Sequence, residues 1–204
     1  MLERNIVSGL LTTFLFSTLV WAKGKIMSSS AEKLNQKTEI AILAGGCFWG
    51  VEELFRKEKG ILKTEVGYTG GKNSDAEKNA KYEFVKKGNT GHAESIKITF
   101  DPNIISYKKL LLFFFKIHDP TTINQQGNDV GSQYRSEIFY TTEEQMRDAK
   151  EVIKSIDQSK AWKKPIVTAV TKATDFFSAE DFHQDYLQKN PGGYTCHWER
   201  KLDF

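Results

Sequence analysis

The sequence predicts a single α+β domain in which a layer of strands is covered by helices. Apolar runs with strand character alternate along the chain with segments of helical periodicity, and an irregular tail follows the last of them. Of the 204 residues, 39% are hydrophobic and 27% are charged, which is ordinary for a globular protein that buries a core without needing disulfides. The pattern leaves the order of the strands in the sheet open.

The first 22 residues have a composition of their own. Residues 6–22 carry no charge, end in small residues and are followed by a lysine. This pattern is typical of a secretory signal peptide cleaved after Ala22, so we expect an exported protein, periplasmic or secreted. An uncleaved membrane anchor is one alternative, because the run approaches the roughly 20 residues that span a bilayer. A start at Met27 would instead give a cytoplasmic protein.

The folded domain is expected to begin after a linker. Residues 23–38 are polar and rich in Ser, Lys and Asn, so the predicted domain is 39–204. The apolar run 39–45 predicts a buried strand that ends at a glycine pair. Apolar residues at helical spacing predict a helix over 47–60, capped at its end by a glycine. A second strand follows at 61–68, closed by the turn sequence Thr-Gly-Gly.

The middle of the domain repeats this alternation. Residues 93–102 alternate apolar and polar side chains, which predicts a third strand. Ser106 is a suitable N-cap for an apolar helix that ends before Pro120. The segment 121–131 holds too many polar and turn residues for a regular element, and 132–141 reads as a strand.

The last third contains two more helices and one more strand. A helix is predicted over 141–156, where Thr141 and Glu144 have capping-box spacing. A strand at 165–173 and a helix at 178–190 follow. The final residues show little periodicity and are expected to wrap the surface.

Charge and histidine spacing argue against two classes of function. The chain has 29 basic and 26 acidic residues, and its lysines are scattered singly among acids. Nucleic-acid binders concentrate basic charge on a patch, so we expect no nucleic-acid partner. The four histidines lack the paired spacing of metal ligands, so we expect no metal site.

One of the two cysteines, Cys47, lies in the stretch AGGCFWG. The predicted strand ends at Ala44, and the predicted helix begins within a residue or two of the thiol. A helix N-terminus lowers the pKa of a thiol through its free N–H groups and its dipole, which would make Cys47 a nucleophile. A small core residue, half of a structural disulfide and a metal ligand are the alternatives that this stretch leaves open.

The third predicted strand contributes a carboxylate. Its period of two places Glu94 on the same side as the apolar Ile96 and Ile98. Burial there would raise the pKa of Glu94 and keep it protonated near neutral pH, as a general acid requires. The alternative is that the strand end reaches solvent and that Glu94 points outward.

Further candidates lie in or beside loops. Tyr82, Asp129 and Tyr134 each also have an ordinary structural interpretation, as half-buried or turn residues. Cys196 lies in the irregular tail. A thiol at a helix start and another on a mobile segment fit a reactive and a resolving cysteine, while a permanent Cys47–Cys196 bridge is the alternative.

Five blocks of the sequence resemble the peptide methionine sulfoxide reductase A family. In order they are GGCFWGVEELF, VGYTGG, GNTGHAESIKITFDP, IHDPTTINQQGNDVGSQYRSEIFY and SAEDFHQDYLQKNPGGYTCH, and they cover about residues 40–198. The resemblance implies a ferredoxin-like core and the thiol-dependent reduction of methionine S-sulfoxide in oxidised proteins, with the free amino acid as a second candidate substrate. It implies thioredoxin or a similar dithiol as external reductant and no bound cofactor. We expect a monomer.

The resemblance also implies a role for each candidate. Cys47 would be the nucleophile that attacks the sulfoxide sulfur, and Glu94 the acid that protonates its oxygen. Tyr82 and Tyr134 would hydrogen-bond this oxygen, and Asp129 would help to organise the site.

The remaining implied roles concern the substrate and the recycling of the thiol. Phe48 and Trp49 would form the pocket for the substrate's methyl group, with Tyr186 and Tyr194 nearby. Cys196 would be the resolving cysteine. A general thiol–disulfide oxidoreductase or peroxidase is the alternative enzyme, and a secreted binding domain is the non-enzymatic alternative.

Overall fold

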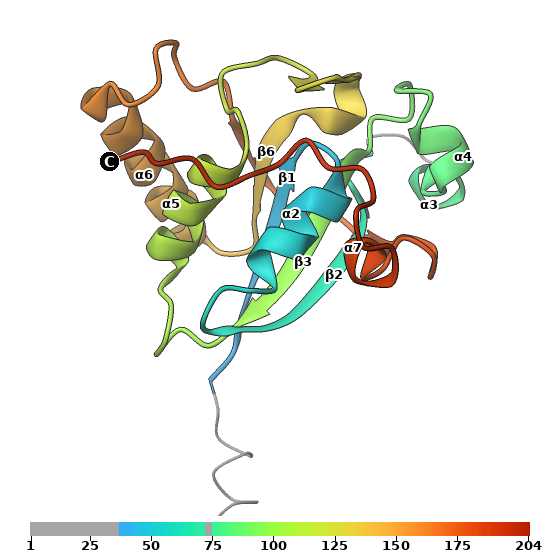
Figure 1. The fold of residues 1–204 in the computed structure, drawn as a ribbon, viewed down its shortest axis with the longest axis horizontal. Helices are drawn as coiled ribbons and strands as arrows, with labels where there is room; N and C mark the ends of the chain where they lie inside the picture. Colours follow the sequence, from blue (N-terminus) through green and yellow to red (C-terminus); the bar gives the residue numbers. More distant parts are fainter. Residues whose placement is uncertain (1–36, 72–74) are drawn as a thin grey trace, which may run out of the picture. The chain divides into compact units, whose positions relative to one another are not determined.

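The computed structural model of the protein describes residues 37–71 and 75–204. Its centre is a six-stranded sheet with the strand order β7-β6-β1-β3-β2-β8 (Figure 1). The strands are β1 (Glu39–Gly45), β2 (Ile61–Thr69), β3 (Ala93–Phe100), β6 (Ser136–Tyr140), β7 (Ala169–Lys172) and β8 (Phe177–Ser178). Neighbouring strands are antiparallel, except for the parallel pair of β6 and β7. The predicted α+β class is confirmed.

Helices complete the domain. The three longer ones are α2 (Phe48–Phe55), α5 (Tyr107–Ile117) and α6 (Glu143–Ser159). Short elements are α3 (Ala76–Asn79), α4 (Tyr82–Val85), α7 (Tyr186–Lys189) and the 3-10 helix η1 (Ser132–Tyr134). A two-stranded ribbon of β4 (Gln125–Gln126) and β5 (Asp129–Val130) lies in the segment predicted to be irregular.

The predicted leader and most of the predicted linker lie outside the described residues. The leader is predicted at residues 1–22 and the linker at 23–38, and of these the structure describes only residues 37 and 38. Within the described part of the chain, no helix is long and apolar enough to cross a membrane.

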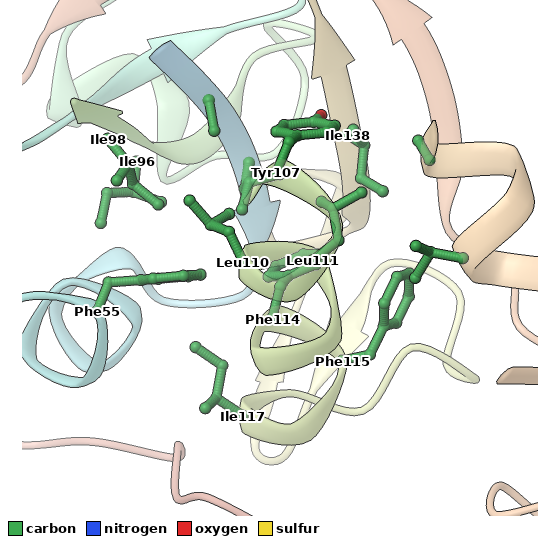
Figure 2. Packing of buried hydrophobic residues seen from close by; sticks show 14 of the residues in the cluster. Phe55, Ile96, Ile98, Tyr107, Leu110, Leu111, Phe114, Phe115, Ile117 and Ile138 are labelled. Carbon is green, nitrogen blue, oxygen red and sulfur yellow. The ribbon is translucent and has the colours of Figure 1, made fainter. Parts of the chain in front are cut away.

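The main core lies between the sheet and the helices α2, α5 and α6 (Figure 2). Helix α5 has buried side chains at the spacing of one helical face, among them Leu110, Leu111 and Phe114. They pack with Ile96 and Ile98 of β3 in one cluster. Each such side chain contributes about 1.5–3 kcal/mol by leaving water. This core holds the strand–helix turn of β1 and α2 in place.

Two helix boundaries differ from prediction. Helix α2 ends at Phe55, because the polar run that follows offers no apolar face, and Gly60 instead forms a turn with φ +99°. Helix α6 is capped by Thr142, whose hydroxyl accepts a hydrogen bond from the backbone N–H of Gln145. The predicted capping box is therefore one residue too early.

The segment predicted as a helix over 178–190 has another structure. It begins in β8, continues through turns and becomes helical only in α7. Gln184 explains the difference, because its side-chain amide accepts from the backbone N–H of Val66 at 3.0 Å and donates to the carbonyl of the same residue at 2.9 Å. The backbone N–H of Ala179 also donates to the carbonyl of Val66 at 3.0 Å, so this segment is held to β2 as an extended chain. The predicted strands 132–141 and 165–173 are likewise shorter, since η1 precedes β6 and β7 begins at Ala169.

The C-terminal tail has no regular element, as predicted, but it is held firmly to the domain. His197 is buried, and the backbone N–H of Arg200 donates to the carbonyl of Lys116 in α5 at 3.0 Å. Figure 1 shows the tail in red, running from α7 past α2 and α5. Cys196 therefore lies on an anchored segment, where the sequence suggested a loose one.

Candidate functional site

Glycines shape the turn that carries Cys47. The thiol residue is the N-cap of α2, directly after β1. Gly46 has φ +101°, a conformation that side-chain-bearing residues rarely adopt, and a Cβ there would lie 2.6 Å from Cβ of Gln126. A Cβ on Gly50 would lie 2.6 Å from Nδ1 of His197. Bare backbone at both positions lets the loop and the tail close around the thiol.

A cavity of about 150 Å³ opens at the N-terminus of α2. It is lined by Cys47, Phe48, Trp49, Tyr82, Glu94, Asp129, Tyr134 and Tyr194. The fold thus brings together every predicted site residue except Tyr186 and Cys196, which lie behind this lining. A volume this small admits the tip of a side chain rather than a whole drug-sized ligand.

Two larger hollows exist elsewhere on the domain. One, of about 550 Å³, lies along α6 and β7, and the other, of about 590 Å³, surrounds Arg135 and Glu137. No cysteine is among the residues that line either of them. Of these three hollows, the smaller cavity is therefore the one that has a cysteine in its lining.

Glu94 is buried at the start of β3 and faces the backbone of α2. One carboxyl oxygen accepts a hydrogen bond from the backbone N–H of Phe48 at 3.2 Å. Burial raises the pKa of Glu94 to about 8, and the charge of Asp129 adds to this rise, while the hydrogen bond from Phe48 opposes it. The predicted burial is confirmed. At neutral pH this carboxyl group holds a proton that it can donate.

Cys47 has a raised pKa, so the prediction of a lowered one is wrong. Burial raises the pKa of the thiol well above its usual value, and the charges of Glu94, Asp129 and Cys196 act in the same direction. The backbone N–H of Trp49 lowers it, but a helix of two turns does not offset the loss of water around a side chain that is 6% exposed. The thiol in the structure is protonated at neutral pH.

Tyr82 and Tyr134 contribute hydroxyl groups to the cavity. Tyr82 begins α4, while Tyr134 ends η1, at the start of the segment 132–141 predicted to be a strand throughout. Burial raises the pKa of both phenols, and the charge of Glu94 adds to it. Both therefore remain hydrogen-bond donors at neutral pH.

An aromatic cluster supports one wall of the cavity. The ring of Trp49 stacks on Tyr186 with centroids 3.8 Å apart. Its indole N–H donates to Nδ1 of His183 at 3.0 Å, and the His183 ring also packs against Phe48 and Tyr82, at 5.2 and 4.7 Å. Tyr186 thus acts on the cavity through Trp49.

His183 and Glu180 are site residues that the sequence analysis missed. Glu180 accepts from the backbone N–H of Tyr82 and from the hydroxyl of Tyr68, each at 2.9 Å. His183 is 1% exposed and lies three residues before Tyr186. That spacing within the block SAEDFHQDYLQKN was the available signal, but only the fold shows that these side chains reach α2 and α4.

Asp129 connects the cavity with the second cysteine. Its Oδ2 accepts from the hydroxyl of Tyr194 at 3.1 Å and from Sγ of Cys196 at 3.4 Å. Burial raises the pKa of Cys196 to about 12, and Asp129 adds to this rise. Both cysteines are free thiols in the structure. Cys196 therefore stands behind the cavity wall as a protonated thiol.

Metal ligands are not clustered in residues 37–71 and 75–204. No group of three or more His, Cys, Asp or Glu side chains there could hold a metal ion.

Comparisons with known proteins agree on one family. The family model described as "Peptide methionine sulfoxide reductase" matches residues 39–203. A Mycobacterium sp. (strain MCS) protein named peptide methionine sulfoxide reductase MsrA is 53% identical over 160 residues, which are 78% of this chain and 89% of that protein. The crystal structure of reduced Mxr1 from Saccharomyces cerevisiae has a TM-score of 0.77 and 36% identity, covering 82% of this chain and 94% of Mxr1. A structure of Mxr1 in complex with Trx2 shares the fold, with a TM-score of 0.55 and 24% identity over 82% of this chain and 93% of that one.

Proposed function

The chain belongs to the peptide methionine sulfoxide reductase family, and we propose that it reduces the S epimer of protein-bound methionine sulfoxide to methionine in the cavity around Cys47. One observation carries the assignment of the site. The cavity places the Cys47 thiol in the same small space as a buried, protonated Glu94 and the hydroxyls of Tyr82 and Tyr134. These are a nucleophile, an acid and two hydrogen-bond donors.

The chemistry needs this combination. A sulfoxide oxygen leaves sulfur only if it is protonated while the sulfur is attacked. The Cys47 sulfur attacks the substrate sulfur while Glu94 donates its proton to the oxygen, and the thiol proton restores Glu94. With this second proton from Glu94 the oxygen leaves as water, and a water molecule then adds its oxygen to the Cys47 sulfur, breaks the bond to the substrate sulfur and returns one proton to Glu94. The products are methionine and a Cys47 sulfenic acid, so the cysteine sulfur loses the two electrons that the substrate sulfur gains. The two phenols stabilise the developing charge in a site shielded from water.

The raised pKa of Cys47 fits this sequence of events. Deprotonating the thiol before substrate binds would place a second negative charge beside Asp129 in a buried site. If the thiol loses its proton only while the sulfoxide oxygen is protonated, that charge does not form. The reaction thus starts with both Cys47 and Glu94 protonated and neutral.

Recycling of the sulfenic acid follows from the position of Cys196. Its thiol attacks the Cys47 sulfur, a disulfide forms, and the oxygen leaves as water. An external dithiol of the thioredoxin class then reduces the disulfide by thiol exchange. Support comes from the hydrogen bond of Cys196 to the cavity residue Asp129, and from Mxr1, whose structure with Trx2 has this fold.

Selection of one epimer follows from fixed positions for two substituents of the substrate sulfur. Glu94 and the phenols hold the oxygen, while Phe48 and Trp49 accept the methyl group. The rest of the peptide must extend out through the mouth of the cavity. With the peptide in that position, the opposite epimer cannot direct its oxygen to Glu94 and its methyl group to Phe48 and Trp49 at the same time. Resemblance to the A family makes the S epimer the expected substrate.

Reduction of a peptide with racemic methionine sulfoxide tests this function. We expect half of the sulfoxide to be consumed, with the R epimer remaining, and no reduction by Cys47→Ser. Cys196→Ser should complete one turnover but lose cycling with thioredoxin. Consumption of both epimers, or turnover of peroxide or disulfides with no sulfoxide reduction, would favour a general thiol oxidoreductase.

We propose further that the protein is exported. The support is the uncharged run of residues 6–22 before Lys23, which is typical of a cleaved leader. N-terminal sequencing of the protein purified from its native cells should begin at Lys23. A mature protein that begins at Met27 in the cytoplasm would contradict export.

A further inference from the structure

We propose that His197 is the base that removes the proton from the Cys196 thiol when the Cys47–Cys196 disulfide forms. This inference rests on the proposed function, because it takes Cys196 as the thiol that attacks the Cys47 sulfenic acid. Neither the fold nor the family comparison assigns a role to His197. The geometry of its two ring nitrogens does.

The hydrogen bonds of His197 determine which nitrogen can accept a proton. Its Nε2 lies 2.7 Å from the carbonyl oxygen of Gly45. A carbonyl oxygen only accepts, so in the neutral ring the hydrogen is on Nε2 and Nδ1 carries a lone pair. Nδ1 lies 3.5 Å from Sγ of Cys196. The ring is therefore held in the tautomer that presents an acceptor to the thiol.

The glycine turn at Cys47 holds this ring in place. His197 is 6% exposed. A Cβ on Gly46 would lie 3.2 Å from its Nε2, and a Cβ on Gly50 would lie 2.6 Å from its Nδ1. The imidazole thus packs on the bare backbone that flanks the nucleophile. The base, the resolving thiol and Cys47 are parts of one closely packed unit.

Cys196 needs such a base. With a pKa of about 12, on the order of one thiol in 10⁵ would be ionised at pH 7. A thiol attacks sulfur as the thiolate, so disulfide formation without a base would be slow. Because the pKa of His197 is about 4, its ring does not hold this proton before the attack. The proton moves to Nδ1 while the S–S bond forms, so the sulfur is bonded to Cys47 as it loses its proton and no free thiolate is needed first.

Two acceptors face the Cys196 thiol, and charge favours the imidazole. Oδ2 of Asp129 lies 3.4 Å from Sγ, but it also accepts from Tyr194, and its negative charge opposes formation of a thiolate. Proton transfer to His197 instead creates an imidazolium beside the thiolate, and the two charges attract each other.

Burial keeps His197 neutral before the attack. Burial lowers its pKa to about 4, the cation of Arg200 acts in the same direction, and the Gly45 carbonyl and Asp129 oppose them. His118, which also interacts electrostatically with this ring, is itself buried with its pKa lowered to about 3 and is neutral. His197 is thus an available acceptor throughout the neutral range.

The proposed step balances. Cys196 Sγ bonds to the Cys47 sulfur while the Cys47 S–O bond breaks, and the thiol proton passes to His197. The leaving hydroxide takes the proton of Glu94, and His197 returns its proton through water to Glu94. The net products are one disulfide and one water, with the sulfenic sulfur reduced by one electron and the thiol sulfur oxidised by one.

The test measures disulfide formation by itself. Reduced protein is mixed with one equivalent of a methionine sulfoxide peptide, and samples are quenched with dimedone and iodoacetamide over time. Mass spectrometry then quantifies the Cys47 sulfenic acid and the Cys47–Cys196 disulfide. The variant is His197→Gln, whose amide can donate to Gly45 but is no base. The control is Trp198→Phe, at an exposed neighbouring position.

We expect a difference in rate and in pH dependence. At pH 7, His197→Gln should form the disulfide at least about tenfold more slowly, and its sulfenic acid should accumulate. From pH 6 to about 7.5 its disulfide rate should rise about tenfold per pH unit, because free ionisation must supply the thiolate. The wild-type and Trp198→Phe rates should stay flat over this range and fall above it, because Glu94, with a pKa of about 8, then loses the proton that the leaving hydroxide takes.

Other results would overturn the proposal. A wild-type rate at pH 7 in His197→Gln contradicts it, and so does a slowing by the same factor at every pH, which indicates a displaced tail. If His197→Gln does not fold, the wild-type profile decides, because a rise of about tenfold per pH unit excludes a resident base. A wild-type protein that forms no Cys47–Cys196 disulfide refutes the proposed resolving role of Cys196 itself.

Discussion

At the scale of single residues, burial decides which groups of the cavity hold a proton. Glu94 has a pKa of about 8, and the pKa of Cys47 is raised as well, so both are neutral near pH 7. A neutral Glu94 also removes the negative charge that would otherwise oppose ionisation of the thiol. Complete reduction of a sulfoxide to a sulfide and water consumes two protons. The resting site holds one on each of these residues.

Replacing Glu94 by Gln should slow the reduction step by about 10²–10⁴-fold, because an amide supplies no acid proton. The acid form is the active one, so the wild-type single-turnover rate should fall as pH rises through about 8. This fall should be absent in Glu94→Gln. Single-turnover assays of methionine formation against pH provide the check.

Ser95→Ala is the matched control for Glu94. It changes the next residue of β3, whose hydroxyl only donates to the carbonyl of Ala93 within the same strand. Its rate should stay near that of the wild type. An unchanged rate in Glu94→Gln would show that another group protonates the oxygen.

At the scale of elements, the turn from β1 into α2 joins the reactive thiol to the tail. Gly46 and Gly50 lie on either side of Cys47, and the tail residues Thr195 and His197 pack on this backbone. One short motif therefore makes the sharp turn, begins the helix and receives the resolving segment. The arrangement requires small residues for reasons of space as well as backbone conformation.

Gly50→Ala should displace the tail. Alanine normally stabilises a helix relative to glycine, by about 0.5–1 kcal/mol, but here its Cβ would overlap the Thr195 hydroxyl and the His197 ring. We expect a net loss of about 1–3 kcal/mol in the free energy of unfolding and slower Cys47–Cys196 disulfide formation. Urea denaturation and the quenched single-turnover assay measure the two effects.

Thr195→Ala in the same background provides the control for Gly50→Ala. It removes the hydroxyl nearest to the added methyl group, so part of the disulfide rate should return. A Gly50→Ala protein that is more stable than the wild type and recycles normally would show that the tail packs elsewhere in solution.

At the scale of the whole molecule, the sheet and α5 form the core against which the site is built. The Leu110 and Phe114 side chains of α5 are fully buried, and β3 contributes Ile96 and Ile98 to the same cluster (Figure 2). Glu94 lies at the start of β3, and the later residues Ile96 and Ile98 of the same strand belong to this core. The acid is thus positioned by the strand that the core holds.

Leu110→Ala should lower the free energy of unfolding by about 2–5 kcal/mol, because it leaves a cavity in this core. Lys109→Ala, at the exposed neighbouring position of α5, should change it by no more than about 0.5 kcal/mol. Denaturant unfolding of the two variants measures the difference. Equal stabilities would mean that α5 contributes little to holding the sheet.

Local patterns were enough to predict most elements and two residues of the cavity, Cys47 and Glu94, while the roles of its other residues came from the resemblance to the family. The period of two in β3 predicted the burial of Glu94, Ser106 caps α5 as expected, and the glycine pair predicted the turn at Cys47. Such features depend on neighbours in the chain, through hydrogen bonds and side-chain periodicity, so they are readable without a fold.

Contacts between residues far apart in the chain could be seen only in the fold. His183 supports Trp49 from 134 positions away, and the pKa of Cys47 rises because distant segments exclude water from it. The loss of water around Cys47 cannot be predicted from the spacing of residues along the chain. The residue types along the chain supply the chemical groups of the site. The packing of the tail, β3 and α2 sets which of these groups hold a proton, because desolvation is a property of the assembled fold.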